Sequence, residues 1–399
     1  MFEVELHDLV VFLIAAGLVV PAARRLRLNP ILGFLAVGMA VGPFGLARFA
    51  EELPILGAVA ITNVGAASSL AELGVVFLLF MIALELPLER LLAMRRLVFG
   101  LGLMQVVLTT LAIFGIAYGF GNSLPSSLLI GGALALSSTA IVSQHLLERN
   151  LLATEVGQIS LGVLLAQDLA VVPMLFLLGT FDPSTAGEPA ATAVGSELYA
   201  VLSSLGFAML QAACVIGIIV LVGRWLMRPV FRLVNVDHSS DVFMATTLLV
   251  IAVTTILTHA AGLSAALGAF LAGLVLAETE FRHEIEMVIE PLKGLLLGLF
   301  FMSVGMNINL LEVAANPGWI VASVVGLLVL KALVVAGLAR CFGFTLPTST
   351  EAGLMLGQGG EFAFVIVGGA VAIKLVDDSI GQFMLIVVSA TMVLTPTII

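Results

Sequence analysis

The chain has 399 residues, of which 61% are hydrophobic and only 11% are charged. A soluble protein with a mean hydropathy of +1.20 could not cover its apolar surface with so few polar groups. The composition therefore excludes an ordinary soluble domain and indicates that lipid surrounds most of the chain. The formal net charge of −10 is less informative than the places where the charges fall.

The apolar runs have the length of membrane-spanning helices, which need about 20 residues to cross the bilayer core. They lack the strict alternation of a membrane β-barrel. The sequence therefore predicts an all-α polytopic membrane protein with about 13 transmembrane helices. These helices are expected at 6–23, 29–46, 68–87, 97–120, 126–147, 156–180, 197–224, 241–260, 262–278, 292–310, 318–341, 349–372 and 379–398.

The basic residues predict the orientation. If the N-terminus lies outside, most of the 16 Lys and Arg residues fall in inner loops, as the positive-inside rule requires. Arg24, Arg25 and Arg27 then form the first inner cluster, while Glu51 and Glu52 lie outside. An odd number of spans places the C-terminus in the cytoplasm.

Two of the expected spans contain residues that interrupt helices. The run 133–144 places Ser137, Ser138 and Thr139 at mid-membrane, and the run 354–365 contains GQGG followed by Glu361. Irregular backbone at this depth is tolerated where it is buried in protein or lines a cavity. For the hydroxyl residues taken alone, close helix packing is an open alternative.

The two interrupted spans are the fifth members of two six-span halves that run in opposite directions. This arrangement is typical of inverted repeats with paired discontinuous helices around a midplane site. We expect one transmembrane domain over 1–399, with repeat one at about 6–180, a linker helix at about 197–224 and repeat two at about 241–398.

Three ionisable residues, Asp168, Lys331 and Glu361, fall near the centres of their spans. A charge at the bilayer centre costs at least about 2.5–3.5 kcal/mol, so these side chains should face one another or a wet cavity. The trio predicts an ion or proton site, in which Lys331 keeps Asp168 ionised until a cation arrives. A purely structural pair that locks the helices together is the alternative.

Several motifs resemble the membrane domain of the Kef family of potassium efflux systems, within the monovalent cation/proton antiporter superfamily. They are the Gln167–Asp168 pair in LLAQDLAVVP, the stretches LSSTAI and HLLERN, the run 280–306 and GQGGEFAFV at 357–365. The resemblance covers essentially the whole chain. It implies a sodium/proton-antiporter-like fold, in which a core bundle moves against a dimerisation scaffold by alternating access.

The resemblance also implies roles for the site residues. Asp168 would alternately hold a proton and a cation, with Gln167 beside it and cation-facing oxygens from Ser138 and Thr139. Members with two adjacent carboxylates here are typically electrogenic, so the neutral Gln167 favours electroneutral exchange.

The remaining midplane residues match the family pattern. Lys331 corresponds to the lysine that pairs with the ion-binding carboxylate. Glu361 corresponds to a glutamate expected to neutralise helix-end dipoles. The glycines of the second discontinuous helix are Gly357, Gly359 and Gly360.

Kef systems are gated by a soluble C-terminal nucleotide-binding domain that is regulated by glutathione and its adducts. We expect this domain to be absent by truncation, because no glycine-rich nucleotide fingerprint follows a strand. We expect no cofactor in this chain and a potassium or sodium ion as substrate, with nucleotide or glutathione acting only through the missing domain.

The expected partners are membrane lipid, a second copy in a homodimer, and a cytosolic regulatory domain or ancillary subunit, without nucleic acid. The expected location is a bacterial inner membrane. A charged inner loop is a docking site for such a domain or, as an open alternative, a solvated surface helix. Its residues of interest are Arg282, His283, Glu286, Glu290 and Lys293.

The sequence thus predicts a secondary transporter, not an enzyme, that exchanges a monovalent cation, potassium in the first place, for protons. A sodium/proton antiporter of the same fold is one alternative. A ligand-gated, channel-like potassium pathway is another, although channels usually need a symmetric ring of filter groups. An intramembrane aspartyl protease would need two like carboxylates sharing a proton, and the intervening Lys331 argues against it.

Overall fold

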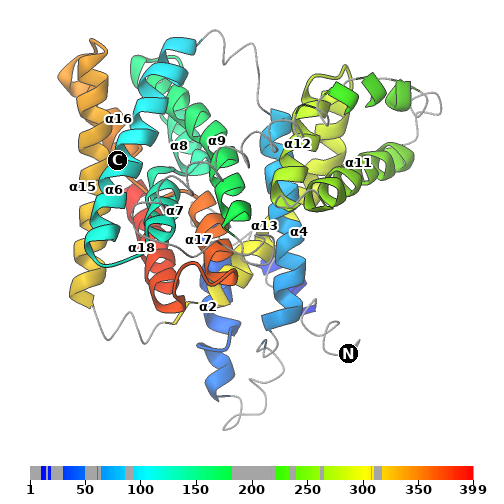
Figure 1. Cartoon of the computed structure of the whole chain (residues 1–399), viewed down its shortest axis with the longest axis horizontal. Coiled ribbons are helices and arrows are strands. Elements are labelled where there is room, and N and C mark those ends of the chain that lie inside the picture. The colour runs from blue at the N-terminus through cyan, green and yellow to red at the C-terminus, as the bar shows by residue number, and fades with distance from the viewer. Residues whose placement is uncertain are drawn as a thin grey trace, which may run out of the picture. The chain divides into compact units, whose positions relative to one another are not determined.

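In the computed structural model, every regular element of the described residues is a helix (Figure 1). The described residues are 10–14, 17–18, 30–49, 61, 64–85, 94–181, 217, 221–223, 225–227, 229–232, 240–260, 265–306, 308–309 and 317–398. The chain splits into two compact units. The first unit comprises Met1–Val75, Glu89–Val171 and Leu295–Ile399, and the second comprises Val76–Leu88 and Val172–Gly294.

The helices follow the predicted spans closely. In the first half of the chain they are α2 (Pro30–Val41), the 3₁₀ helix η1 (Leu46–Phe49), α4 (Val64–Glu85), the π-helix η2 (Arg96–Gly102), α6 (Leu103–Gly119), α7 (Leu124–Ala135), α8 (Thr139–Glu148) and α9 (Glu155–Thr180). In the second half they are α11 (Ser240–Ala260), α12 (Ala265–Ala277), α13 (Arg282–Met306), α15 (Pro317–Cys341), α16 (Leu346–Met355), α17 (Phe362–Ala372) and α18 (Asp378–Ile398). The predicted spans at 6–23 and 197–224 lie largely outside the described residues.

Among the described residues, five helices are long and apolar enough to cross a membrane. They are Arg96–Gly119, Glu155–Thr180, Asp241–Thr258, Pro317–Cys341 and Asp378–Thr395. A sixth is added if the two halves of α13, which meet at a 44° bend, form one span. The predicted spans at 126–147 and 349–372 are each divided into two shorter helices, α7/α8 and α16/α17.

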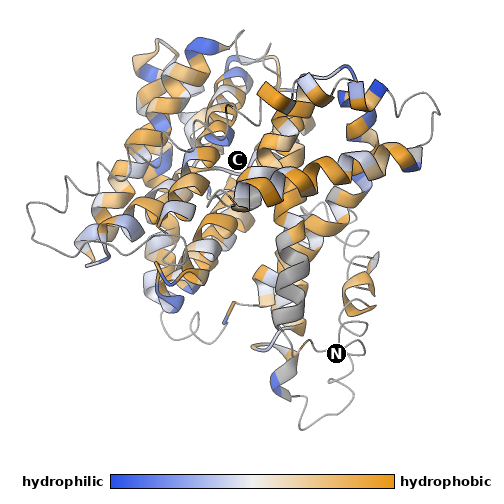
Figure 2. Ribbon diagram, turned by 45° about the vertical axis from the view of Figure 1, so that its right-hand side comes forward, coloured by the Kyte–Doolittle hydropathy of each residue, from blue (hydrophilic) through white to orange (hydrophobic). Residues whose placement is uncertain are grey.

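The side chains of α15 show how these helices divide lipid from protein. Val321, Val325, Val329 and Leu333 form an exposed apolar stripe with helical spacing. Lys331 belongs to the opposite, buried stripe. Much of the helical ribbon in Figure 2 carries the colour of hydrophobic residues, as expected for helices in lipid.

The first predicted interruption is confirmed between α7 and α8. Leu136 has an extended backbone (φ −76°, ψ 150°), and residues 136–138 are not helical. Ser138 is also extended, and its hydroxyl accepts a hydrogen bond from the Ile141 N–H at 3.4 Å, which caps α8. Serine favours such a cap because its oxygen replaces a missing helical acceptor.

The second predicted interruption is confirmed between α16 and α17. Gly357, Gly359 and Gly360 all lie in the non-helical stretch between Met355 and Phe362. Glycine is disfavoured within a helix because it loses the most backbone entropy there. The stretch therefore ends α16 without a proline.

Each pair of broken helices begins with the same short motif. GNSLPSS (121–127) spans the start of α7, and GFTLPTS (343–349) spans the start of α16. Gly121 and Gly343 have φ values of 89° and 97°, a left-handed conformation that glycine adopts without strain. Ser123 and Thr345 then cap the two helices through their hydroxyls. The local sequence thus starts both half-helices in the same way.

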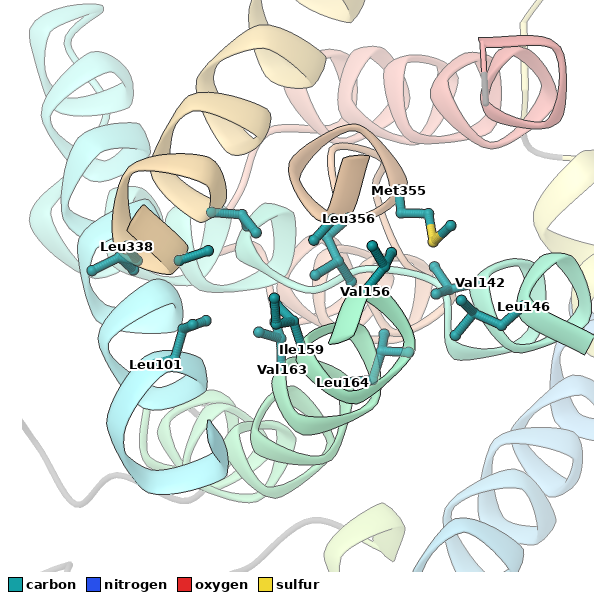
Figure 3. Close-up of a cluster of buried hydrophobic side chains, with 13 residues drawn as sticks. Leu101, Val142, Leu146, Val156, Ile159, Val163, Leu164, Leu338, Met355 and Leu356 are labelled. Atoms are coloured by element: carbon teal, nitrogen blue, oxygen red, sulfur yellow. The ribbon is translucent and has the colours of Figure 1, made fainter. Parts of the chain in front are cut away.

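A buried apolar cluster packs α8 and α9 against α16 and η2 (Figure 3). Val142 and Leu146 come from α8, and Leu356 immediately follows α16. Their burial holds α8 and the end of α16 in place next to the breaks, since burying each large apolar side chain contributes about 1.5–3 kcal/mol. The remaining members are Leu101, Val156, Ile159, Val163, Leu164, Val335, Leu338, Ala339, Ala352 and Met355.

The charged inner segment is helical, in line with the surface-helix alternative, and its role as a docking site stays a prediction. Arg282, His283, Glu286 and Glu290 all lie in the first half of α13, and Lys293 continues that helix. Ile285 and Ile289, one helical turn apart, are fully buried and account for the helix. His283 Nδ1 lies 3.6 Å from Glu286 Oε2, a side-chain pair one turn apart on the surface.

Candidate ion-binding site

A buried carboxylate faces the start of a half-helix. Asp168, in the middle of α9, is only 8% exposed. The hydroxyl of Thr139, the first residue of α8, donates a hydrogen bond to Asp168 Oδ1 at 3.3 Å. A helix N-terminus carries a partial positive charge that stabilises an anion. This geometry therefore gives Asp168 a hydrogen bond from the Thr139 hydroxyl and a favourable helix dipole.

The two serines before Thr139 have different partners. Ser138 directs its hydroxyl to the Ile141 N–H, within its own helix. The Ser137 hydroxyl donates to the Leu356 carbonyl at 2.8 Å, which joins the first break directly to the second. Thr139 is thus the hydroxyl of this group that contacts the carboxylate.

The amide of Gln167 bonds both sides of the first break. Its Oε1 accepts from the Ser137 N–H at 2.8 Å, and its Nε2 donates to the Ala135 carbonyl at 3.3 Å. Nε2 also donates to Gln105 Oε1 at 2.8 Å and to Ser137 Oγ at 3.3 Å. The side chain predicted to lie beside the cation is therefore engaged with the backbone of the break.

Lys331 bonds one carbonyl in each break. Its Nζ donates to the Leu136 carbonyl at 2.6 Å and to the Gln358 carbonyl at 2.5 Å, and the side chain is completely buried. The sequence predicts pairing with Asp168, whereas these two contacts are to main-chain oxygens. Leu136 follows the C-terminus of α7 and Gln358 closely follows that of α16, so the ammonium lies where helix ends are partially negative.

The second break repeats the contacts of the first. The Gly359 N–H donates to Thr391 Oγ1 at 3.0 Å, as the Ser137 N–H does to Gln167. Lys331 bonds the carbonyls of Leu136 and Gln358. These two residues are as far apart in sequence as Ser137 and Gly359, so the two breaks correspond position by position. In both halves a long helix thus supplies a side chain that satisfies the break.

Two further polar residues follow in the second break. Glu361, 6% exposed, immediately precedes the first residue of α17 and makes no side-chain capping bond to it, so neutralisation of the helix dipole by this carboxylate stays a prediction. The side chain of Gln358 is completely buried, and neither amide atom has a hydrogen-bond partner in the described part of the chain. Its amide nitrogen and amide oxygen are thus both available for hydrogen bonds inside the protein.

Gly360 allows the two breaks to touch. A Cβ atom on Gly360 would lie 2.8 Å from both the backbone carbon and the carbonyl oxygen of Ser137. We expect Gly360→Ala to lower the stability by about 1–3 kcal/mol, because overpacking must displace backbone. Thermal unfolding of the purified protein measures this loss.

Gly368→Ala is the matched control, because a Cβ on Gly368 in α17 would have no neighbour within 4 Å. This variant should unfold at the wild-type temperature or above it, since alanine is the better helix former. Equal behaviour of the two variants would contradict close contact between the breaks.

Sequence reasoning missed Gln105, Thr109 and Thr391, all completely buried. Gln105 and Thr109 lie one turn apart on the buried face of α6. Polar residues at a spacing of four in an otherwise apolar span were an available signal. Thr391 had no such signal, because the spacing that relates the two breaks places Ser389, not Thr391, opposite Gln167.

The donors around Asp168 suit a hard cation. The Asp168 carboxylate and the Thr139 hydroxyl offer oxygen ligands, which such ions prefer. Within the described residues, no group of three or more His, Cys, Asp or Glu side chains could hold a metal ion.

Comparison with known proteins identifies the fold. The family model "Sodium/hydrogen exchanger, transmembrane" matches residues 10–399. The structure of the sodium proton antiporter MjNhaP1 from Methanocaldococcus jannaschii at pH 8 superposes with a TM-score of 0.67 at 17% identity, covering 100% of this chain and 96% of that one. The predicted fold class, an all-α polytopic membrane protein with a sodium/proton-antiporter-like fold, is confirmed.

Two curated relatives come from Arabidopsis thaliana. K(+) efflux antiporter 2, chloroplastic, is 42% identical over 397 residues, and K(+) efflux antiporter 1, chloroplastic, is 41% identical over 396 residues. Each alignment covers 99% of this chain but only 32% of the relative. The chain thus spans about a third of the length of the curated relatives it matches. Together with the family match, these relatives confirm the predicted resemblance to monovalent cation/proton antiporters.

Proposed function

Because the chain belongs to the sodium/hydrogen exchanger family, a family of transporters rather than enzymes, we propose that it exchanges a monovalent cation for protons. In this proposal Asp168 is the shared site, and it is exposed alternately to the two sides of the membrane. A proton and a metal ion cannot both occupy one carboxylate fully. If the core bundle can change from facing one side of the membrane to facing the other only when Asp168 is neutralised by a proton or a cation, this exclusion is sufficient for antiport.

The observation that supports the proposal most is the contact of Asp168 with Thr139. An ionisable group in the membrane is costly and marks a functional site by default. Here the carboxylate is 8% exposed and lies at the N-terminus of a half-helix, with a hydroxyl 3.3 Å away. Discontinuous helices that point their ends at a midplane site are the ordinary construction of ion-coupled transporters.

Potassium is the substrate that we propose first, because two relatives that are 41–42% identical are K(+) efflux antiporters. Sodium is the second candidate, favoured by the family model and by the likeness to a sodium proton antiporter. With Gln167 neutral beside Asp168, one-for-one electroneutral exchange is part of the proposal.

The proposed setting is a multi-pass protein of a bacterial inner membrane, with its N-terminus outside, acting as a homodimer. The two inverted repeats at about 6–180 and 241–398, joined by a linker helix at about 197–224, remain part of the proposal. The first half of α13 is the proposed contact of a cytosolic regulatory domain or ancillary subunit.

The test is cation-induced dequenching of a pH-sensitive dye in proteoliposomes that hold an imposed proton gradient. Potassium, sodium, lithium and choline chlorides are added in turn to the wild-type protein. We expect a potassium response that saturates, with choline inactive, because choline cannot enter an oxygen-lined site built for a small cation.

A response to sodium alone would keep the mechanism but overturn the potassium assignment. Potassium flux without any movement of protons would overturn antiport and favour a channel, since a channel needs no pH gradient. Exchange that changes with membrane voltage, measured with a valinomycin clamp, would contradict electroneutral stoichiometry.

A further inference from the structure

A buried chain of amides supports the first break from behind. Gln105, on α6, donates through Nε2 to Thr109 Oγ1 at 3.1 Å and to the Ala135 carbonyl at 3.2 Å. Its Oε1 accepts from Gln167 Nε2 at 2.8 Å. Both Gln105 and Gln167 are at most 1% exposed, so protein groups must supply these bonds.

The partners fix the orientation of both amides. A carbonyl such as that of Ala135 can only accept, so both side chains must present nitrogen to it. The Ser137 N–H can only donate, so Gln167 must present oxygen to that side. With its nitrogen and oxygen so assigned, Gln167 can bond Gln105 only through Nε2. The network therefore has one consistent arrangement.

This arrangement is connected to the carboxylate through two pairs of residues that are close in sequence. Gln167 precedes Asp168 on α9, and Ser137 lies two residues before Thr139. A bond between Gln167 and Ser137 thus sets the position of the Thr139 hydroxyl relative to Asp168. If the amide turned, the Ser137 N–H would lose its acceptor, and the start of α8 could shift away from the carboxylate.

We propose that Gln105 is a positioning residue for ion binding: it fixes the Gln167 amide and thereby places the Thr139 hydroxyl against Asp168. The inference rests on the proposed function, because it concerns the same ion site. An amide is required at both positions, since a carboxylate at 167 would turn an acceptor toward the Ala135 carbonyl and Gln105 Oε1.

The second half of the chain has no amide pair at the position that corresponds to Gln105 and its partner. By the spacing that relates Ser137 to Gly359, Gln105 corresponds to Leu327. There the hydroxyl of Thr391 accepts from the Gly359 N–H, and Leu327 is part of the buried stripe of α15. The amide pair therefore occurs in the half whose break contacts Asp168.

The test compares Gln105→Leu and Gln105→Glu with the wild type in the dequenching assay. For Gln105→Leu we expect the apparent KM for the cation to rise about tenfold, as for other residues that orient ligands from outside the site. The maximal rate should change much less, because Asp168 and Thr139 remain. Cation-induced thermal stabilisation of the purified protein should weaken in parallel, and this readout does not require transport.

Gln105→Glu keeps the acceptor for Gln167 Nε2 but turns a carboxylate oxygen toward the Ala135 carbonyl, so its KM should rise at least as much as that of Gln105→Leu. Gln382→Leu, which removes an amide on α18 outside this network, is the matched control and should keep the wild-type KM. If Gln105→Leu does not fold, the KM of Gln105→Glu decides.

Wild-type KM values in the Gln105 variants would overturn the inference. So would a lower maximal rate at unchanged KM, shared with Gln382→Leu, because this would indicate a merely structural role. Failure of the proposed function is distinguishable: the wild type itself would then show no cation-dependent proton movement and no stabilisation by cations.

Discussion

Replacement of Asp168 by asparagine is expected to reduce cation-dependent proton movement to the level of empty liposomes. Asparagine has nearly the same shape and its Oδ1 can still accept from Thr139. It can neither take up a proton nor offer a negative charge to a cation. The substitution therefore abolishes binding of both the proton and the cation while leaving the local packing intact. The same dye assay with an imposed proton gradient measures the loss.

The thermal stability of Asp168→Asn separates a functional charge from a structural one. Burying a carboxylate costs free energy, so a variant without the charge should unfold at the wild-type temperature or above it. A carboxylate that served to lock the helices would instead cost about 3–5 kcal/mol when removed from its partner. Full stability with no exchange is the expected combination.

Glu155→Gln, at the exposed start of the same helix, is the matched control and should exchange like the wild type. Exchange retained by Asp168→Asn would remove Asp168 from the mechanism. A large loss of stability in that variant would favour the structural alternative.

Much of the fold could be predicted because hydropathy reports on whole helices. The predicted span at 318–341 is found as Pro317–Cys341, and that at 156–180 as Glu155–Thr180. The breaks were also predictable, since serines, threonines and glycines at mid-membrane are local signals. For the charged segment 282–293 the sequence left a docking site and a surface helix open; the segment is helical, with Ile285 and Ile289 buried at helical spacing, and the docking role stays a prediction.

The site was only partly predictable, for a physical reason. Asp168 and Thr139 stand out as polar residues in apolar runs, but the partners of Lys331 are main-chain carbonyls, which every residue has. Only the broken helices decide which carbonyls are free. Gln105 bonds Gln167 from 62 residues away in sequence, and such a contact depends on how α6 packs against the break.

Lys331→Met is expected to cause the second large effect, a loss of both stability and exchange. Methionine has a similar length but no donor, so the Leu136 and Gln358 carbonyls would lose the ammonium that bridges them. Hydrogen bonds to charged groups contribute about 1.5–3 kcal/mol each. Both carbonyls belong to the breaks that meet beside Asp168, so the site should be disordered as well. Thermal unfolding and the dye assay measure the two losses.

Lys331→Arg should recover part of the stability, because a guanidinium keeps the charge and donates to more than one carbonyl. Its larger head must fit a completely buried position, so full recovery is not expected. Lys374→Met, an exposed lysine that pairs with Asp378 at the surface, is the control and should change stability by less than about 1 kcal/mol.

The double variant Lys331→Met with Asp168→Asn decides between the two roles of the lysine. If Lys331 mainly compensates the charge of Asp168, removal of both charges should restore most of the stability lost in Lys331→Met, and the effects would be strongly non-additive. If Lys331 mainly bridges the carbonyls of the two breaks, the double variant should remain as unstable as Lys331→Met alone. The bonds from Nζ to Leu136 and Gln358 favour the second result. In that case the ammonium is the cation that joins the two halves of the site, whatever ion Asp168 holds.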